Sequence, residues 1–156
     1  MINYKNFLNE IVQTEFKLKR IRDLYRDRVL DTLNDKDNDF FWNLVEFVNW
    51  SEFINNKDKI DFDDLREKVE TEFGDINEYH RVYELLKRNL TEYFEPVVLN
   101  DETESQTGDD GYIDLISSII GKGKDFIGEI LKDDDILINM VKNKGYRENF
   151  GYIFNK

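Results

Sequence analysis

Four acidic residues have a spacing that could bind calcium. Asp35, Asp37, Asp39 and Glu46 occupy positions one, three, five and twelve of an EF-hand loop, in which carboxylates bind a hard cation. Position six, where the sharp turn of that loop requires glycine, is Phe40. The segment therefore favours helix capping in a solvated acidic turn, and we expect no metal site there.

Residue types that commonly act in catalysis are scarce in the rest of the sequence. His80 is the only histidine, and there is no cysteine. A Ser-His-Asp arrangement would have to use Ser51, Ser105, Ser117 or Ser118, and none of these serines lies in a G-x-S-x-G context. We therefore expect His80 at the surface or at the edge of the core, with no catalytic residue and no cofactor.

Gly121-Lys122-Gly123-Lys124 resembles a phosphate-binding loop only superficially. The spacing G-x-x-x-x-G-K-[ST] is absent, and a helix rather than a strand is predicted before the segment. The segment is interpreted as a glycine-rich break between two helices. A metal-dependent hydrolase that uses a cluster of Asp and Glu is an alternative of a different class, although thirty-four carboxylates make any one chosen pair uninformative.

The charge balance limits the partners of this protein. Asp and Glu number 34 and Lys and Arg number 22, which gives a formal net charge of -12. A surface this negative repels nucleic acid and anionic lipid and attracts cationic partners. The lack of cysteine excludes disulfides and fits a reducing compartment. Because no export signal or bilayer-spanning apolar run of roughly 20 residues is visible, we expect a cytoplasmic protein.

The residues considered above are expected to lie on or between helices. Apolar residues recur at steps of three and four from Tyr4 to Leu33, which predicts a long helix over 1–34. This segment carries a net charge of +2 and could contact the acidic remainder. Similar patterns predict a helix that starts at Phe40, a helix through residue 73 with Asp61 as its N-cap, and a helix over 76–94 that ends before Pro96.

The second half of the sequence begins with an acidic stretch. Residues 97–110 contain five acids and no base, which predicts an acidic loop. A helix is expected to follow from Gly111, then a short helix to Leu131 and another after Asp133, and the alternating pattern near 150–154 predicts an extended segment. The sequence thus predicts an all-α, single-domain multi-helix bundle of about six helices over residues 1–156.

Two segments carry a resemblance to a known family. Phe41-Trp42-Asn43-Leu44-Val45 is similar to an early F-W-x-L-[IV] helix. Gly108-Asp109-Asp110-Gly111-Tyr112 and Ile119-Ile120-Gly121-Lys122-Gly123-Lys124 are similar to a later S-D-D-G-F segment and an I-x-x-G-[KR] helix end. Over about positions 39–154 the chain resembles a bacterial domain-of-unknown-function 4240-like family. The resemblance implies an all-helical bacterial protein and no activity that could be carried over.

The charge balance favours a binding role. The leading hypothesis is a non-enzymatic protein that inhibits or masks a basic protein partner, such as a toxin or a nuclease, as an immunity protein does. The alternative in the same class is a phage or mobile-element protein that mimics DNA and blocks a defence nuclease. The candidate partner-binding residues are acids in two clusters and two aromatic anchors: Asp61, Asp63, Asp64, Asp101, Glu102, Glu104, Asp109, Asp110, Tyr79 and Tyr83.

Overall fold

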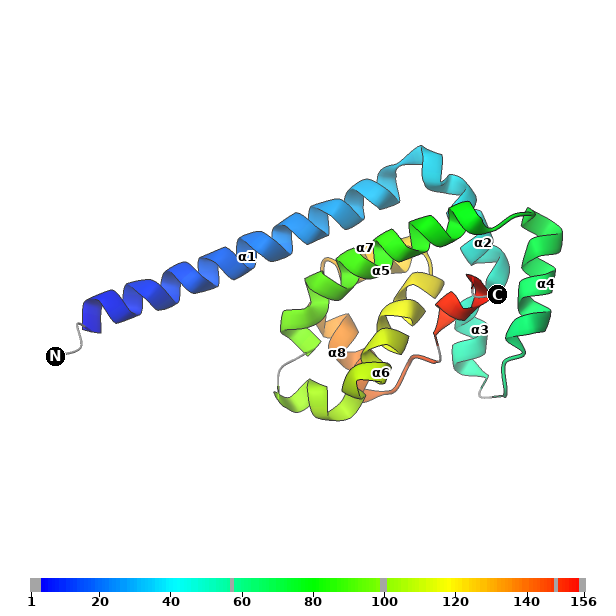
Figure 1. The fold of residues 1–156 in the computed structure, drawn as a ribbon. Coiled ribbons are helices and arrows are strands. Elements are labelled where there is room, and N and C mark those ends of the chain that lie inside the picture. The colour runs from blue at the N-terminus through cyan, green and yellow to red at the C-terminus, as the bar shows by residue number, and fades with distance from the viewer. Residues whose placement is uncertain (1–3, 57, 99–100, 148, 155–156) are drawn as a thin grey trace.

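The fold is all-α, as the sequence predicted, and no strand occurs in the residues that the structure describes. The computed structural model describes residues 4–56, 58–98, 101–147 and 149–154, with side chains from residue 13 onward except at 101–109 (Figure 1). A 3-10 turn, η1, follows the first helix, and a 3-10 helix, η2, lies near the C-terminus. The elements are α1 (Tyr4–Asn34), η1 (Lys36–Asn38), α2 (Asp39–Val48), α3 (Trp50–Asn55), α4 (Phe62–Phe73), α5 (Asn77–Val98), α6 (Asp101–Gly121), α7 (Lys124–Ile130), α8 (Asp134–Lys142) and η2 (Phe150–Phe154).

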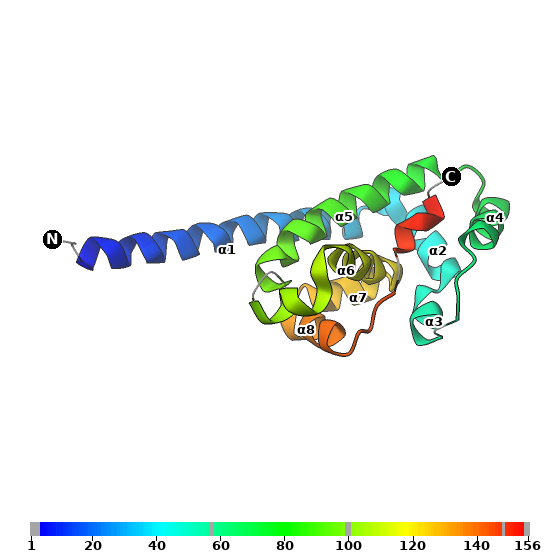
Figure 2. The ribbon, with the colours of Figure 1, turned by 60° about the horizontal axis from the view of Figure 1, so that its bottom comes forward.

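Helix α1 confirms the predicted long N-terminal helix. Its C-terminal half lies along α5, and its N-terminal half projects beyond the rest of the molecule (Figures 1 and 2). Val29 and Leu33 are buried in the core, whereas every side chain from 13 to 21 is exposed. Arg22 joins the helix to the acidic remainder through an ion pair with Asp134.

The predicted helix after Phe40 is present as α2 and is followed directly by α3. Asn49 separates the two helices with a left-handed backbone conformation, φ 53° and ψ 60°. Asparagine tolerates this conformation better than most residues other than glycine. The change of direction places Trp50 at the start of α3, where its side chain is fully buried.

Helix α4 has the predicted caps, and α5 is longer than predicted. The Asp61 carboxylate accepts a hydrogen bond from the Asp64 backbone N–H, and Gly74 ends α4 with a φ of 77°. The prediction that the next helix ends before Pro96 is wrong, because α5 continues to Val98. Proline removes one N–H donor and restricts the preceding residue, but here both effects fall in the last turn. The complete burial of Val98 favours this continuation of the helix.

Residues 101–121 form α6, so the predicted acidic loop at 97–110 is wrong. Residues 97–98 belong to α5, and 101–110 form the first turns of α6. Carboxylates near a helix N-terminus interact favourably with the helix dipole, so a run of acids without apolar residues is compatible with helix. Asp110 and Gly111 consequently lie inside α6 and do not mark its start.

The C-terminal segment is a 3-10 helix, and the predicted extended segment is wrong. Phe150, Ile153 and Phe154 are buried. Positions i and i+3 of a 3-10 helix share one side, so this conformation places Phe150 and Ile153 together in the core. An extended strand would have put these two residues on opposite faces.

Helices α5 and α6 pack against each other at the centre of the molecule, and buried hydroxyl groups join them to other elements. The Trp50 indole nitrogen donates to the Ser118 hydroxyl oxygen at 3.2 Å. Gly121, one turn further along α6, leaves space for this ring, because a Cβ at that position would lie 2.7 Å from Cγ of Trp50. The close approach of α3 to α6 therefore depends on glycine at this position.

Candidate functional site

The candidate site is the exposed acidic surface of α4. Asp63 and Asp64 lie in the first turn of the helix. Glu67 is four residues after Asp63 and three after Asp64, so the three carboxylates are neighbours on the helix surface. All three residues are exposed, and the side chain of Asp63 is 94% exposed. With the N-cap Asp61, these residues form what we call the α4 acidic face: Asp61, Asp63, Asp64 and Glu67.

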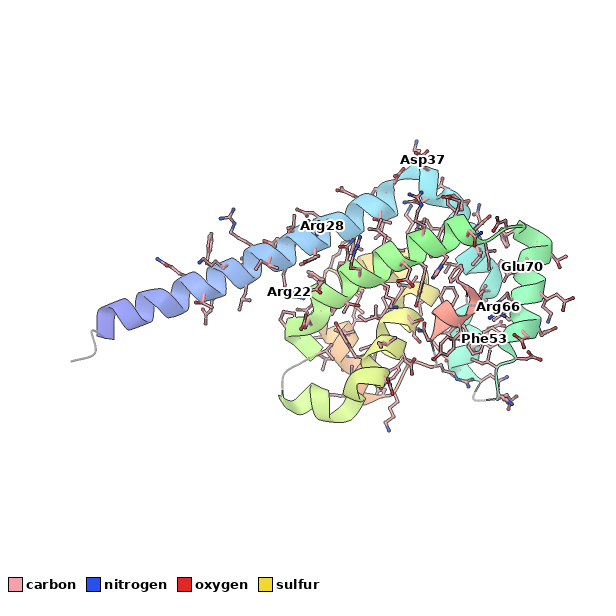
Figure 3. The ribbon with its side chains drawn as sticks, in the orientation of Figure 1. Arg22, Arg28, Asp37, Phe53, Arg66 and Glu70 are labelled. Atoms are coloured by element: carbon pink, nitrogen blue, oxygen red, sulfur yellow. The ribbon has the colours of Figure 1, made fainter. Side chains whose placement is uncertain are left out.

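The arginine of α4, Arg66, directs two of its nitrogens toward the C-terminal segment and a third toward Asp63, at the inner edge of this face. Nε of Arg66 donates to the carbonyl oxygen of Ile153 at 3.0 Å, and Nη2 donates to that of Tyr152 at 2.7 Å. Figure 3 shows Arg66 on the inner side of α4. Its side chain is 16% exposed and also pairs with Asp63. Lys68, which pairs with Asp64, is the exposed base of this helix.

Tyr79, one of the two predicted anchors, is partly buried at the edge of the core. Its ring meets the ring of Phe40 edge-on with centroids 4.8 Å apart, and it meets the ring of Phe73 at 5.9 Å. Such edge-to-face contacts are favourable for aromatic pairs. Tyr79 therefore serves mainly to join α5 to α2 and α4, and only part of its side chain is available to a partner.

Tyr83, the second predicted anchor, is a core residue, so its assignment to a binding surface is wrong. It is 1% exposed, and its hydroxyl contacts the Ser117 hydroxyl oxygen at 3.2 Å and the Asn149 amide oxygen at 2.8 Å. Burial raises the pKa of Tyr83 to about 12, because the charged form would lose its hydration. Helix periodicity placed Tyr83 on an apolar face but did not show what covers that face.

The other predicted acidic cluster lies elsewhere. Asp110 is exposed on α6, and α6 begins at the opposite end of the body from α4 in both ribbon views (Figures 1 and 2). The structure therefore does not bring the two acidic clusters together. The remaining predicted residues of this cluster have side chains outside the described residues: Asp101, Glu102, Glu104 and Asp109.

Sequence reasoning missed Tyr152, an aromatic residue that lies beside the α4 acidic face. Its side chain is 45% exposed, and its ring meets the ring of Phe62 edge-on with centroids 5.4 Å apart. Its carbonyl oxygen accepts the hydrogen bond from Arg66. Tyrosine is enriched at protein interfaces because one side chain offers both apolar area and a hydroxyl group. The only sequence signal was an aromatic residue in a segment interpreted as extended.

Two of the residues considered for catalysis, His80 and Ser118, have structural contacts. His80 is partly exposed, pairs with Glu84 at 3.2 Å and stacks on the ring of Phe154, with centroids 5.5 Å apart. Ser118 is buried, and its hydroxyl oxygen accepts a hydrogen bond from the Arg147 backbone N–H. His80 thus lies at the edge of the core, as the sequence predicted.

A groove of about 680 Å³ includes the segment Gly121 to Lys124. The bases Lys122 and Lys124 line it together with the acids Glu46 and Asp125, so the groove carries no single sign of charge. The Lys122 ammonium group lies 4.9 Å from the centroid of the Phe126 ring. Gly123 has a φ of 106° and separates α6 from α7, which agrees with the interpretation of a glycine-rich helix break.

The segment that resembled a calcium loop forms a capped turn. The Asp35 carboxylate accepts a hydrogen bond from the backbone N–H of Asp37 at 2.9 Å at the start of η1. Across the part of the chain that the structure describes, no group of three or more His, Asp or Glu is placed to hold a metal ion. In the same residues, no helix has the length and apolar character needed to cross a membrane.

The α4 acidic face is thus a surface of neighbouring carboxylates beside an exposed aromatic ring. In comparisons with known proteins, the sequence matches no family model, no curated protein and no solved structure.

Proposed function

We propose that this chain is a non-enzymatic binding protein that uses its α4 acidic face to capture and mask a basic protein partner, as an immunity protein masks a toxin or a nuclease. The observation that carries this proposal is the inward orientation of Arg66. Because the guanidinium group is held by the carbonyl oxygens of Tyr152 and Ile153, the exposed side of α4 carries Asp63, Asp64 and Glu67 against one exposed base, Lys68.

Neighbouring carboxylates fit such a role because they attract a basic surface over a long range. Like charges at i, i+3 and i, i+4 destabilise a helix slightly, and a cationic partner would relieve this repulsion. Charge complementarity raises association rates and favours one partner over others. Tyr152 provides an aromatic group that could be buried at the centre of the contact, where tight binding is concentrated.

The alternative of a DNA mimic has less support. Mimicry of a duplex requires carboxylates along one continuous face, but the acidic start of α6 and α4 lie at opposite ends of the body (Figure 1). Lys68 also interrupts the carboxylates of α4. A compact acidic patch beside an aromatic residue fits a protein partner better than it imitates the regular phosphates of DNA.

The experiment is affinity capture from a lysate with the full chain as bait, washed at low and then at high salt. The test variant is D63N/D64N/E67Q, which removes three charges from the α4 acidic face. The matched control is D125N/E129Q/D135N, which removes three exposed carboxylates from α7 and α8. Thermal unfolding of both variants verifies that they fold.

The proposal predicts that one basic protein binds the native chain and the control variant in a 1:1 ratio and stays bound during the high-salt wash. The test variant should not retain this protein. A mixture of basic proteins that the salt wash removes would reject the proposal. Equal retention by both variants would place the binding surface elsewhere.

A further inference from the structure

The N-terminal part of α1 projects from the rest of the molecule (Figures 1 and 2). We call residues 4–21 the arm. All its described side chains, from 13 to 21, are exposed, and burial begins at Arg22, where the guanidinium group meets Tyr93 and Asp134. Figures 1 and 2 both show the arm projecting past the end of α5, on which the rest of α1 lies. An 18-residue helix extends about 27 Å at 1.5 Å per residue.

The arm exposes large apolar side chains. Phe16 is 61% exposed, Leu18 is 52% exposed and Ile21 is 51% exposed, and Leu24 in the next turn is 49% exposed. Most helical stability in proteins comes from packing of an apolar face. Leu18, Ile21 and Leu24 follow one another at intervals of three residues and form one stripe, whereas Phe16 lies on a different side of the helix from Leu18. A contiguous group of exposed apolar residues marks an interaction site in a folded protein. This stripe therefore offers an apolar surface to a packing partner.

The charge of the arm limits the chemistry of that partner. Lys17, Lys19 and Arg20 are exposed within one turn of helix. Residues 1–34 contain seven bases and five acids, and the remaining residues therefore contain 15 bases and 29 acids, with a net charge of -14. The surface that complements a basic, apolar helix should be acidic with exposed apolar groups, and the body of this chain is strongly acidic.

A suitable receiving surface lies at the end of the body beneath the arm. There α5 ends and α6 begins (Figures 1 and 2). Glu92 and Glu95 of α5 are close enough to Tyr112 of α6 to raise the pKa of its phenol, in addition to the larger effect of burial. Ile113, next to Tyr112, is 42% exposed, and Asp110 is exposed one turn earlier. This end thus combines carboxylates with an apolar side chain.

We propose that the arm packs against a second copy of this chain, with the two arms antiparallel and each reaching the acidic α5/α6 end of the other body. A two-fold arrangement of this kind is closed and uses every contact twice. The arm faces away from the α4 acidic face, so this inference is independent of the proposed function. Anionic lipid is the other surface that a basic, apolar helix could contact, but the acidic body is repelled by it.

The experiment measures the mass of the full chain in solution by light scattering after size exclusion, over a range of protein concentrations. The native chain is expected at twice the chain mass of 18.8 kDa. The variant L18Q/I21Q removes apolar contacts and keeps residues that favour helix, and it should weaken the dimer by more than about tenfold. The variant K17E/K19E should weaken the dimer at low salt, because it makes the arm acidic.

The control K59E/K68E changes the net charge by the same amount at exposed lysines on and beside α4, far from the arm, and should remain dimeric. Circular dichroism verifies that each variant is folded. A native chain that stays at 18.8 kDa at all concentrations would overturn the proposal. A dimer that both arm variants leave intact would also overturn it, as would a native monomer that floats with phosphatidylserine vesicles.

Discussion

Arg22 and Asp134 form a bidentate ion pair that joins the first helix to α8. The two nitrogen–oxygen distances are 3.1 and 2.9 Å, and Nε of Arg22 also donates to the Tyr93 carbonyl oxygen at 2.9 Å. The guanidinium carbon lies 4.1 Å from the centroid of the Tyr93 ring. The planar guanidinium group makes all these contacts at once, and a lysine ammonium group cannot.

The substitution Arg22→Lys should therefore lower the free energy of unfolding by about 1–2 kcal/mol despite the retained charge. The matched control is Arg26→Lys, because Arg26 pairs with Asp23 at 3.4 Å on the surface, where such pairs contribute little. Urea unfolding monitored by circular dichroism measures both. Equal stability of the two variants would show that the geometry of the Arg22 contacts is unimportant.

Tyr83→Phe should lower the free energy of unfolding by about 1–3 kcal/mol near neutral pH, because Ser117 and Asn149 would lose a buried partner. The pKa of Tyr83 is raised to about 12 in the folded chain. The stabilisation from its neutral form is complete below about pH 10, the ordinary pKa of tyrosine, and is lost as the pH rises through about 12.

The stability difference between the native chain and Tyr83→Phe should consequently shrink between about pH 10 and 12. Urea unfolding of both chains at several alkaline pH values measures this difference. A difference that stays constant across that interval would contradict the raised pKa of Tyr83.

Two glycine-to-alanine substitutions should change stability in opposite directions. A Cβ at residue 121 would lie 2.7 Å from the Trp50 ring and 2.9 Å from its Cβ, so Gly121→Ala should cost about 1–3 kcal/mol. At Gly128, inside α7, nothing lies within 4 Å of the added Cβ, and Gly128→Ala should stabilise the chain by about 0.5–1 kcal/mol. Thermal and urea unfolding give both values, and two shifts of the same sign would refute this account.

Arg147→Gln should destabilise the connection between α3 and α4. Nη1 of Arg147 lies 3.0, 2.7 and 2.8 Å from the carbonyl oxygens of Phe53, Asn56 and Asp58, and the guanidinium group satisfies these acceptors at and beyond the end of α3. The expected loss is about 1.5–3 kcal/mol of unfolding free energy, with faster hydrogen exchange at 53–58. The control Arg81→Gln removes an exposed pair and should leave both quantities unchanged.

Local signals in the sequence predicted most of the helices. Asp61 and Asp133 are N-caps as expected, because an acidic side chain that accepts a backbone N–H near a helix start is a short-range interaction. The acidic start of α6 and the last turn of α5 were missed. The last turn of α5 depends on packing against other helices, as the buried Val98 shows, and such packing can override local preference.

The candidate site was predicted only in part. Asp61, Asp63 and Asp64 were correctly placed at the start of a helix, but the orientation of Arg66 could not be inferred. Its acceptors lie 86 and 87 residues further along the chain. They are backbone carbonyl oxygens, which every residue has, so the residue types at these positions do not indicate the hydrogen bonds. Tyr83 was misassigned for a related reason: its partners Ser117 and Asn149 are distant in sequence.

Two of the arginines that donate to backbone carbonyls, Arg66 and Arg147, also affect how the fold responds to acidification. The backbone carbonyl oxygens that accept from Arg66 and Arg147 do not titrate, so these connections between distant segments do not depend on an ionised carboxylate. Lowering the pH toward the isoelectric point of about 4.6 meanwhile removes repulsion among the surface acids. Mild acid should therefore reduce the net negative charge of this protein while these two connections stay in place.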